Sequence, residues 1–140
     1  MKRVVIESPY AGKMEENVAY AKRCVGDCLK RGESPYASHL FFTQPGMLDD
    51  LKPEERELGI KAGFAWGKAA DTIVFYIDRG ISGGMLRGVT SALENNKNIE
   101  VRSLDHKVLQ EDIGKLGLIT YFNRIEDMAR EQTELDLLIG

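Results

Sequence analysis

Hydrophobic residues gather in short runs rich in β-branched and aromatic side chains, a pattern typical of buried strands. The predicted strands are Arg3–Glu7, Ala37–Thr43, Thr72–Ile77 and Ile99–Leu104. Between them, apolar residues recur at helical spacing, which predicts helices over Met14–Lys30, Pro53–Ala70 and Gly83–Glu94. Strands that alternate with helices favour a parallel sheet with right-handed crossovers. We therefore predict an α/β fold, a three-layer sandwich of flavodoxin or Rossmann type with a mostly parallel sheet of four or five strands.

The last quarter of the chain has a different pattern. Leu116–Thr120 is apolar and is a candidate fifth strand, and Tyr121–Leu138 is predicted as a charged amphipathic helix. This helix has two possible roles, packing on the core or forming a contact between subunits. We expect residues 1–140 to form a single domain, with residues 105–140 as its C-terminal helical extension.

Composition and charge argue against two classes of binding partner, nucleic acids and membranes. Apolar residues make up 43% of the 140 residues, charged residues make up 29%, and the net charge is −3. No basic stretch is dense enough to follow a phosphate backbone, so we expect no nucleic-acid partner. No apolar run approaches the length of a membrane span, and Glu7 comes too early for a signal peptide. We expect a cytoplasmic protein without membrane contact.

The two cysteines do not indicate a metal site. Cys24 and Cys28 have C-x-x-x-C spacing within a predicted helix, and no Cys/His pair elsewhere completes a zinc site. We expect both to be buried free thiols, because free cysteine packs as a small hydrophobic residue. We predict no metal and no cofactor.

A glycine- and serine-rich turn follows the strand Thr72–Ile77. The turn includes Gly80, Ser82, Gly83 and Gly84, and a predicted helix continues through Met85. This order presents backbone N–H groups and the positive end of a helix to an anion. Ligands of open α/β sheets bind outside the carboxyl ends of the strands. We therefore expect a ligand that carries a phosphate or polyhydroxyl group.

Three segments resemble motifs of the nucleoside 2-deoxyribosyltransferase superfamily, which includes deoxynucleoside monophosphate N-glycosidases. They are Ser8-Pro9-Tyr10 after the first strand, Trp66-Gly67-Lys68-Ala69-Ala70-Asp71 before the third, and Ser82-Gly83-Gly84. The chain looks especially similar to small phage and prophage members. The resemblance implies a nucleoside or nucleotide derivative as ligand and a homo-oligomer, dimeric or larger.

Two positions depart from the pattern of this superfamily. Its members cleave an N-glycosidic bond with two carboxylates, a Glu nucleophile in the first turn of the helix and an Asp before the Trp. Counting from Gly84 and Trp66, the matching positions are Gly88 and Gly63. Glycine has no side chain that can attack or protonate a substrate, and it leaves the pocket wider. Either the chain only binds its ligand or other carboxylates carry the reaction.

The candidate catalytic residues are Asp78, at the carboxyl end of the third strand, and Glu7, at the end of the first. Asp78 has an alternative role in capping the turn that follows it, and Glu7 in bonding to a neighbouring loop. The candidate ligand-binding residues are Ser8, Pro9, Tyr10, His39, Asp49, Trp66, Gly80, Ser82, Gly83, Gly84, Met85 and Arg102.

Several of these candidate binding residues also have a structural interpretation that involves no ligand. His39 is a possible base or a hydrogen-bonded core histidine within a strand. Tyr10 and Trp66 could stack on a base, or pack in a loop and in the core. Asp49, together with Asp50, could coordinate a metal or bind ribose hydroxyls, or it could cap the next helix. Arg102 could clamp a phosphate or face solvent along its strand.

Three functions remain open. The first, which we favour, is a protein that binds a nucleotide or nucleoside derivative and sequesters a host nucleotide signal, as the phage resemblance suggests. The second is an active N-glycosidase or 2-deoxyribosyltransferase, in which Asp78 or Glu7 attacks a deoxynucleoside or its monophosphate. The third is a structural subunit with a vestigial pocket.

Overall fold

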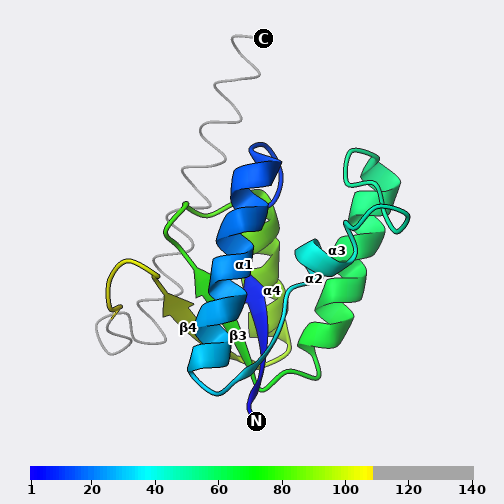
Figure 1. Cartoon of the computed structure of the whole chain (residues 1–140). Coiled ribbons are helices and arrows are strands. Elements are labelled where there is room, and N and C mark those ends of the chain that lie inside the picture. The colour runs from blue at the N-terminus through cyan, green and yellow to red at the C-terminus, as the bar shows by residue number, and fades with distance from the viewer. Residues whose placement is uncertain (109–140) are drawn as a thin grey trace, which may run out of the picture. The chain divides into compact units, whose positions relative to one another are not determined.

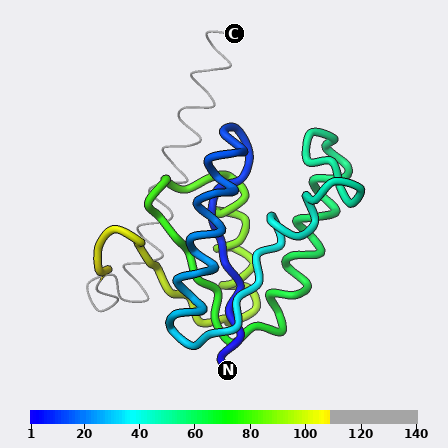
Figure 2. Tube along the Cα trace, viewed as in Figure 1, coloured from blue at the N-terminus to red at the C-terminus, as the bar shows by residue number. Residues whose placement is uncertain are grey.

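The computed structural model describes residues 1–108, and Met1–Lys107 form one compact unit (Figures 1 and 2). The predicted fifth strand and C-terminal helix lie outside the described residues. The elements in chain order are β1 (Arg3–Glu7), α1 (Met14–Lys30), β2 (Ser34–Tyr36), α2 (Ser38–Phe41), α3 (Pro53–Gly67), β3 (Thr72–Tyr76), α4 (Gly83–Glu94) and β4 (Asn98–Arg102).

The four strands form one parallel sheet with the order β2-β1-β3-β4. Val5 of β1 lies opposite Tyr36 of β2 on one side and Ile73 of β3 on the other. The chain adds β2 to one side of β1 and β3 to the other, so the strand order reverses between β1 and β3. In open α/β sheets the ligand crevice lies at such a reversal, beyond the carboxyl ends of the strands.

Helices cover both faces of the sheet, because strand side chains alternate between the faces. Val4 and Ile6 pack in a buried cluster with Tyr20, Cys24 and Cys28 of α1. On the other face, Val5 and Ile73 line a small cavity together with residues of α3 and α4. The predicted three-layer α/β architecture with four parallel strands is confirmed.

The boundaries of most elements follow from local signals. β1, α1 and α4 have the predicted bounds. Pro53 opens α3 at a position where the missing N–H costs nothing. The Ser82 hydroxyl caps α4 by accepting a hydrogen bond from the Met85 amide at 3.2 Å. β3, β4 and the end of α3 differ from the prediction by three residues or fewer.

The predicted strand Ala37–Thr43 is wrong. The second strand is Ser34–Tyr36, and Ser38–Phe41 form the short helix α2, so His39 is helical. A short apolar run cannot be assigned to strand or helix by periodicity alone. β2 is three residues long, lies at the edge of the sheet, and has Pro35 in its middle.

Candidate functional site

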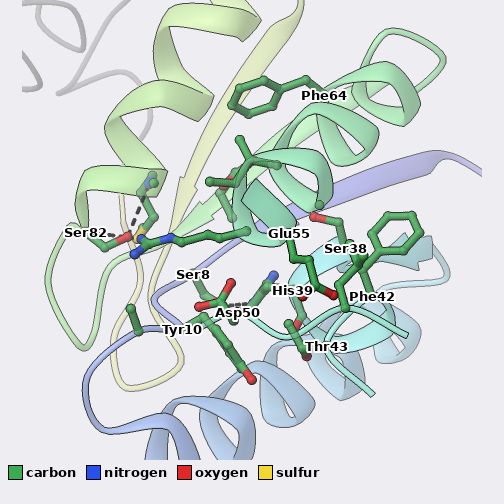
Figure 3. A pocket seen from close by; sticks show the side chains of 18 residues that line it. Ser8, Tyr10, Ser38, His39, Phe42, Thr43, Asp50, Glu55, Phe64 and Ser82 are labelled. Carbon is green, nitrogen blue, oxygen red and sulfur yellow. Dashed lines mark hydrogen bonds between the residues drawn. The ribbon is translucent and has the colours of Figure 1, made fainter. Parts of the chain in front are cut away.

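A cleft opens at the carboxyl edge of the sheet, next to the point where the strand order reverses. Its floor comes from the end of β1, one wall from α2 and α3, and the other from the start of α4 (Figure 3). It is lined by Glu7, Ser8, Tyr10, Ala11, Ser38, His39, Phe42, Thr43, Leu48, Asp50, Glu55, Arg56, Gly59, Ile60, Phe64, Ser82, Gly84 and Met85. Of the predicted site residues, the structure thus brings together Glu7, Ser8, Tyr10, His39, Ser82, Gly84 and Met85.

The carboxyl group of Glu7 lies on the floor of the cleft and against α4. A Cβ atom added at Gly88 would lie 2.8 Å from the carboxyl carbon of Glu7 and 2.9 Å from Oε1. The absence of a side chain at Gly88 therefore makes the space that this carboxyl group occupies. Within residues 1–108, no hydrogen bond or ion pair to the Glu7 carboxyl is found, and its desolvation raises the pKa to about 8.

Gly63 has the same relation to another polar side chain of the cleft. A Cβ atom at Gly63 would lie 2.5 Å from the Oγ atom of Ser38. Gly63 and Gly88 are the two glycines that the sequence resemblance, by counting from Trp66 and Gly84, predicts at the positions of the superfamily's carboxylates. In this chain, side chains from other elements fill the space beside both glycines: a carboxyl group from β1 and a hydroxyl group from α2.

Ser8 and His39 form a polar pair on the cleft wall. Their Oγ and Nε2 atoms share a hydrogen bond of 2.7 Å, drawn as a dashed line in Figure 3. Burial lowers the pKa of His39 to about 4, so its imidazole ring is neutral at physiological pH. The ring of Tyr10 packs edge-on against that of His39, with centroids 6.5 Å apart. The pair can thus offer a hydroxyl group and a neutral imidazole to a ligand.

The N-terminus of α4 forms the opposite wall, and in Figure 3 Ser82 lies across the cleft from Ser38 and Phe42. Among the described residues, the amides of Gly83 and Gly84 donate no hydrogen bond within the chain, as is usual for the first turn of a helix. A Cβ atom at Gly83 would meet open space. The amides are therefore accessible to an acceptor.

Sequence reasoning missed the residues that α3 and the loop before it bring to the cleft. Glu55 and Arg56 supply charges at this wall, and Phe42 and Phe64 supply aromatic surface; Asp50, considered with Asp49 from the sequence, also lines it. The signal that could have found them is positional, because this loop and the start of α3 follow β2 at the carboxyl edge of the sheet.

Asp78, a predicted catalytic residue, does not line this cleft. Its carboxylate accepts hydrogen bonds from the hydroxyl groups of Tyr20 and Ser103, each at 2.5 Å, and from the amides of Leu104 and Asp105. Partial burial raises its pKa, but these hydrogen bonds outweigh burial and bring the pKa to about 2. The group ties the end of β3 to the segment after β4.

Arg102 and Trp66 also lie away from the cleft lining. Arg102 is 4% exposed, and its guanidinium group is bound by Glu33 at 2.7 Å and by Glu100. It is therefore a buried ion-pair residue with no free face for a phosphate. Trp66 is 60% exposed and packs against Tyr36, with ring centroids 5.8 Å apart, so it is neither a core residue nor a wall of the cleft.

Four further predicted site residues, Pro9, Asp49, Gly80 and Gly83, do not line the cleft themselves, although the chain neighbours of Pro9, Asp49 and Gly83 do. Asp49 organises the loop before α3, because its Oδ1 atom accepts a hydrogen bond from the Leu51 amide at 3.0 Å. No cluster of three or more potential metal ligands occurs among residues 1–108. No helix in this part of the chain is long and apolar enough to span a bilayer.

A family model matches residues 2–102, which span β1 to β4. The chain belongs to the DUF7768 family. The family is described as a domain of unknown function, so membership in it does not indicate an activity. The matched residues include the whole cleft, and this DUF7768 chain has no match among curated proteins.

Solved structures share the fold of this DUF7768 chain. The 2-deoxyribosyltransferase of the psychrotolerant bacterium Bacillus psychrosaccharolyticus superposes with a TM-score of 0.53 at 16% identity, covering 76% of each chain. A 2-deoxyribosyltransferase from Leishmania mexicana has a TM-score of 0.50 at 17% identity, covering 81% of this chain and 72% of its own. The predicted resemblance is confirmed at the level of the fold, and kinship with phage proteins stays a prediction.

Proposed function

We propose that the cleft binds a nucleoside or nucleotide derivative. The observation that carries this proposal is the Glu7 carboxyl group, which lies desolvated at the cleft floor with no bonding partner among the described residues. Burying a carboxyl group without partners costs free energy, and proteins retain such groups mainly at functional sites. A ligand with hydroxyl or ring N–H groups would supply the missing hydrogen bonds.

Each part of such a ligand has a matching surface. The aromatic and aliphatic side chains of Phe42, Ile60 and Phe64 suit the faces of a base, and Glu7 and Ser8 suit the hydroxyl groups of a sugar. A phosphate at the start of α4 would accept hydrogen bonds from the amides there, favoured by the helix dipole. If the ligand stays intact, the protein would sequester it, and a nucleotide signal of a host cell is one such ligand.

The test of binding is thermal unfolding of the full chain with deoxynucleosides, their monophosphates and NAD. A ligand at about 100 times its dissociation constant should stabilise the native state by roughly 2.7 kcal/mol. The Glu7→Gln variant should reduce this gain, whereas Glu15→Gln, which changes an exposed carboxylate in the first turn of α1, should not. No stabilisation of the wild-type chain by any of these compounds, up to millimolar concentration, would contradict the proposal.

A second candidate function is hydrolysis of an N-glycosidic bond. The observation that favours it is the position of the Glu7 carboxyl group, directly beside the Cβ position of Gly88. A carboxyl group from β1 thereby lies close to the position at which the Cβ atom of the superfamily's nucleophilic glutamate is expected. The pKa of about 8 keeps Glu7 protonated at neutral pH, which suits a general acid better than a nucleophile.

In this reaction Glu7 would donate its proton to a nitrogen of the base while the bond between that nitrogen and the sugar carbon breaks. The bonding electrons leave with the base, and positive charge develops on the sugar ring. Water adds to the sugar carbon and returns one proton to Glu7. The products are the free base and the sugar, and no redox partner is needed.

Chromatography of the released base separates the two functions. Hydrolysis predicts free base with the wild-type chain, a loss of at least about 100-fold in Glu7→Gln, and wild-type rates in Glu15→Gln. Glu7→Ala combined with Gly88→Glu should restore part of the rate, since it returns a carboxyl group to the same space from α4. Ligand stabilisation without base release would contradict hydrolysis and leave binding as the function.

A further inference from the structure

Two adjacent aspartates precede α3, and their surroundings differ. Asp49 is exposed and lies outside the cleft lining, and its carboxylate already accepts a hydrogen bond from the Leu51 amide. Asp50 is half-buried and lines the cleft. Within residues 1–108, no hydrogen bond or ion pair involves the Asp50 carboxylate. Of the two aspartates, Asp50 is therefore the one that is placed to contact a ligand.

The carboxylate of Asp50 is a free acceptor at this wall of the cleft. The neighbouring carboxylate of Glu55 is engaged, because it accepts a hydrogen bond from the Asp49 amide at 3.2 Å and lies 3.6 Å from the Lys52 ammonium group. Among the described residues, no ion pair joins Asp50 to Arg56, the arginine of the cleft lining. A carboxylate accepts hydrogen bonds and donates none, so a ligand that binds Asp50 must supply donors.

Hydroxyl and imidazole groups line the same cleft as Asp50. Ser8 and His39 share a hydrogen bond of 2.7 Å, and the ring of Tyr10 packs against that of His39. In Figure 3 these side chains lie with Asp50 in the lower part of the view, and Phe64 lies at the upper end. Groups that both donate and accept hydrogen bonds suit the hydroxyl groups of a sugar, whereas the faces of a base suit aromatic surface.

A pair of hydroxyl groups on neighbouring carbon atoms matches an unpaired carboxylate in such surroundings. Each hydroxyl group can donate to one oxygen of Asp50, and hydrogen bonds to a charged acceptor are the stronger ones. Each hydroxyl oxygen can in turn accept a hydrogen bond from a hydroxyl group such as that of Tyr10. Ribose in a nucleoside carries this pair at C2′ and C3′, and 2-deoxyribose lacks the member at C2′.

We propose that Asp50 binds the 2′- and 3′-hydroxyl groups and thereby selects ribose over 2-deoxyribose in the nucleoside or nucleotide that, under the function proposed above, occupies the cleft. That function leaves the sugar open, and the placement of Asp50 assigns it. A ligand without the 2′-hydroxyl group leaves one oxygen of Asp50 unpaired in the complex. Sites that bind a hydroxyl group discriminate against analogues that lack it for this reason.

Calorimetric titration of the full chain tests the sugar preference, with ribonucleosides and 2′-deoxyribonucleosides matched for each common base. For each base that binds, the ribonucleoside should bind about 10- to 100-fold more tightly than its 2′-deoxy form. Equal affinity for the two sugars would overturn the role of Asp50 and leave nucleoside binding intact. Binding of neither form at millimolar concentration would overturn both proposals.

Asp50→Asn tests whether this residue is the source of the preference. The amide nitrogen of asparagine cannot accept a hydrogen bond, so the preference for ribose should fall to about threefold or less. The change of affinity in the variant should be larger for the ribonucleoside than for its 2′-deoxy form, and the difference measures the contact between Asp50 and the 2′-hydroxyl group. Stability without ligand should be unchanged, because the carboxylate has no partner to lose.

Asp49→Asn is the matched control, since it removes the same charge at the adjacent position, outside the cleft lining. This variant should keep the full preference for ribose. A preference that survives in Asp50→Asn, or one that falls equally in Asp49→Asn, would overturn the proposal.

Discussion

Glu7 and Asp78 are carboxyl groups at the ends of neighbouring parallel strands, yet their surroundings are opposite. Asp78 accepts hydrogen bonds from two hydroxyl groups and two amides, and its pKa is brought to about 2. The Glu7 carboxyl group has no such donor among the described residues, and desolvation raises its pKa to about 8. The chain therefore holds one carboxyl group as a fixed anion and the other as a neutral acid.

The difference shows how to separate a structural from a functional acid at the same edge of a sheet. Hydrogen bonds that hold Asp78 in place also consume its capacity to bind a ligand. Glu7 instead lies in a cleft between elements, where a ligand can reach it. Unsatisfied burial costs stability, and such costs are tolerated where function depends on them.

The largest effect is expected for Glu7→Gln at alkaline pH. The folded chain keeps the Glu7 proton up to about pH 8, whereas the unfolded chain releases it near the ordinary glutamate pKa of 4.5. The wild-type free energy of unfolding therefore falls across this interval, and the variant lacks this loss. We expect the variant to be more stable by on the order of 4 kcal/mol at pH 9 and about equal at pH 4.5. Urea unfolding at both pH values checks this, and an equal difference at both would show that Glu7 is not a neutral acid.

Asp78→Asn should destabilise the fold by about 2–3 kcal/mol at pH 7, because an amide cannot accept all the hydrogen bonds that the carboxylate accepts. Asp105→Asn changes an exposed carboxylate nearby and should stay within about 0.5 kcal/mol of wild type. Denaturant unfolding measures both. The comparison with Glu7 breaks down if ligand stabilisation falls as much in Asp78→Asn as in Glu7→Gln.

Gly88→Ala tests the space that Glu7 occupies. The new methyl group would lie 2.8 Å from the carboxyl carbon and displace it, so ligand affinity should drop by about tenfold. Gly67→Ala is the matched control in α3, since a Cβ atom there meets only the Ile73 side chain at 3.7 Å. Calorimetric titration should show unchanged affinity for the control. Equal affinity in both variants would mean that the position of Glu7 does not matter for binding.

The smallest effect is expected for Ser82→Ala. Loss of the cap of α4 should lower stability by about 1 kcal/mol. A phosphate bound at this helix end should lose about 1–3 kcal/mol of affinity, while an unphosphorylated nucleoside should be nearly unaffected. Titration with a matched nucleoside and monophosphate gives the comparison. Equal losses of affinity for the two ligands would show that the phosphate does not bind at the N-terminus of α4.

Hydrophobic periodicity was sufficient to predict the α/β class and most of the elements, because β1, β3 and the amphipathic α1 and α4 have strong patterns of their own. It failed over residues 37–43, where Ser38, His39, Leu40 and Phe41 are too few to reveal a period. Tertiary context decides there, since β2 needs only three residues to pair with β1.

Only part of the site was predicted. Sequence motifs indicate which loops lie at the site, but they do not indicate where each side chain points. Glu7, Ser8, Tyr10 and Ser82 line the cleft, as the position of their segments at the carboxyl edge suggested, and His39 lines it from α2 and not from the predicted strand. Nothing local in the sequence distinguishes the hydrogen-bonded Asp78 from the unpaired Glu7. The hydroxyl partners of Asp78 are Tyr20 and Ser103, which lie 58 and 25 positions away along the chain. Only folding brings them together.

The short strand β2 also bears on how the protein avoids aggregation. An exposed sheet edge is a template on which foreign strands can add and fibrils can grow. Here the edge is three residues long, and Pro35 has no amide hydrogen to offer. The border beside the aromatic surface of Tyr36 and Trp66 is thus a poor seed for fibril growth, which lets the chain display hydrophobic rings there at little risk of precipitation.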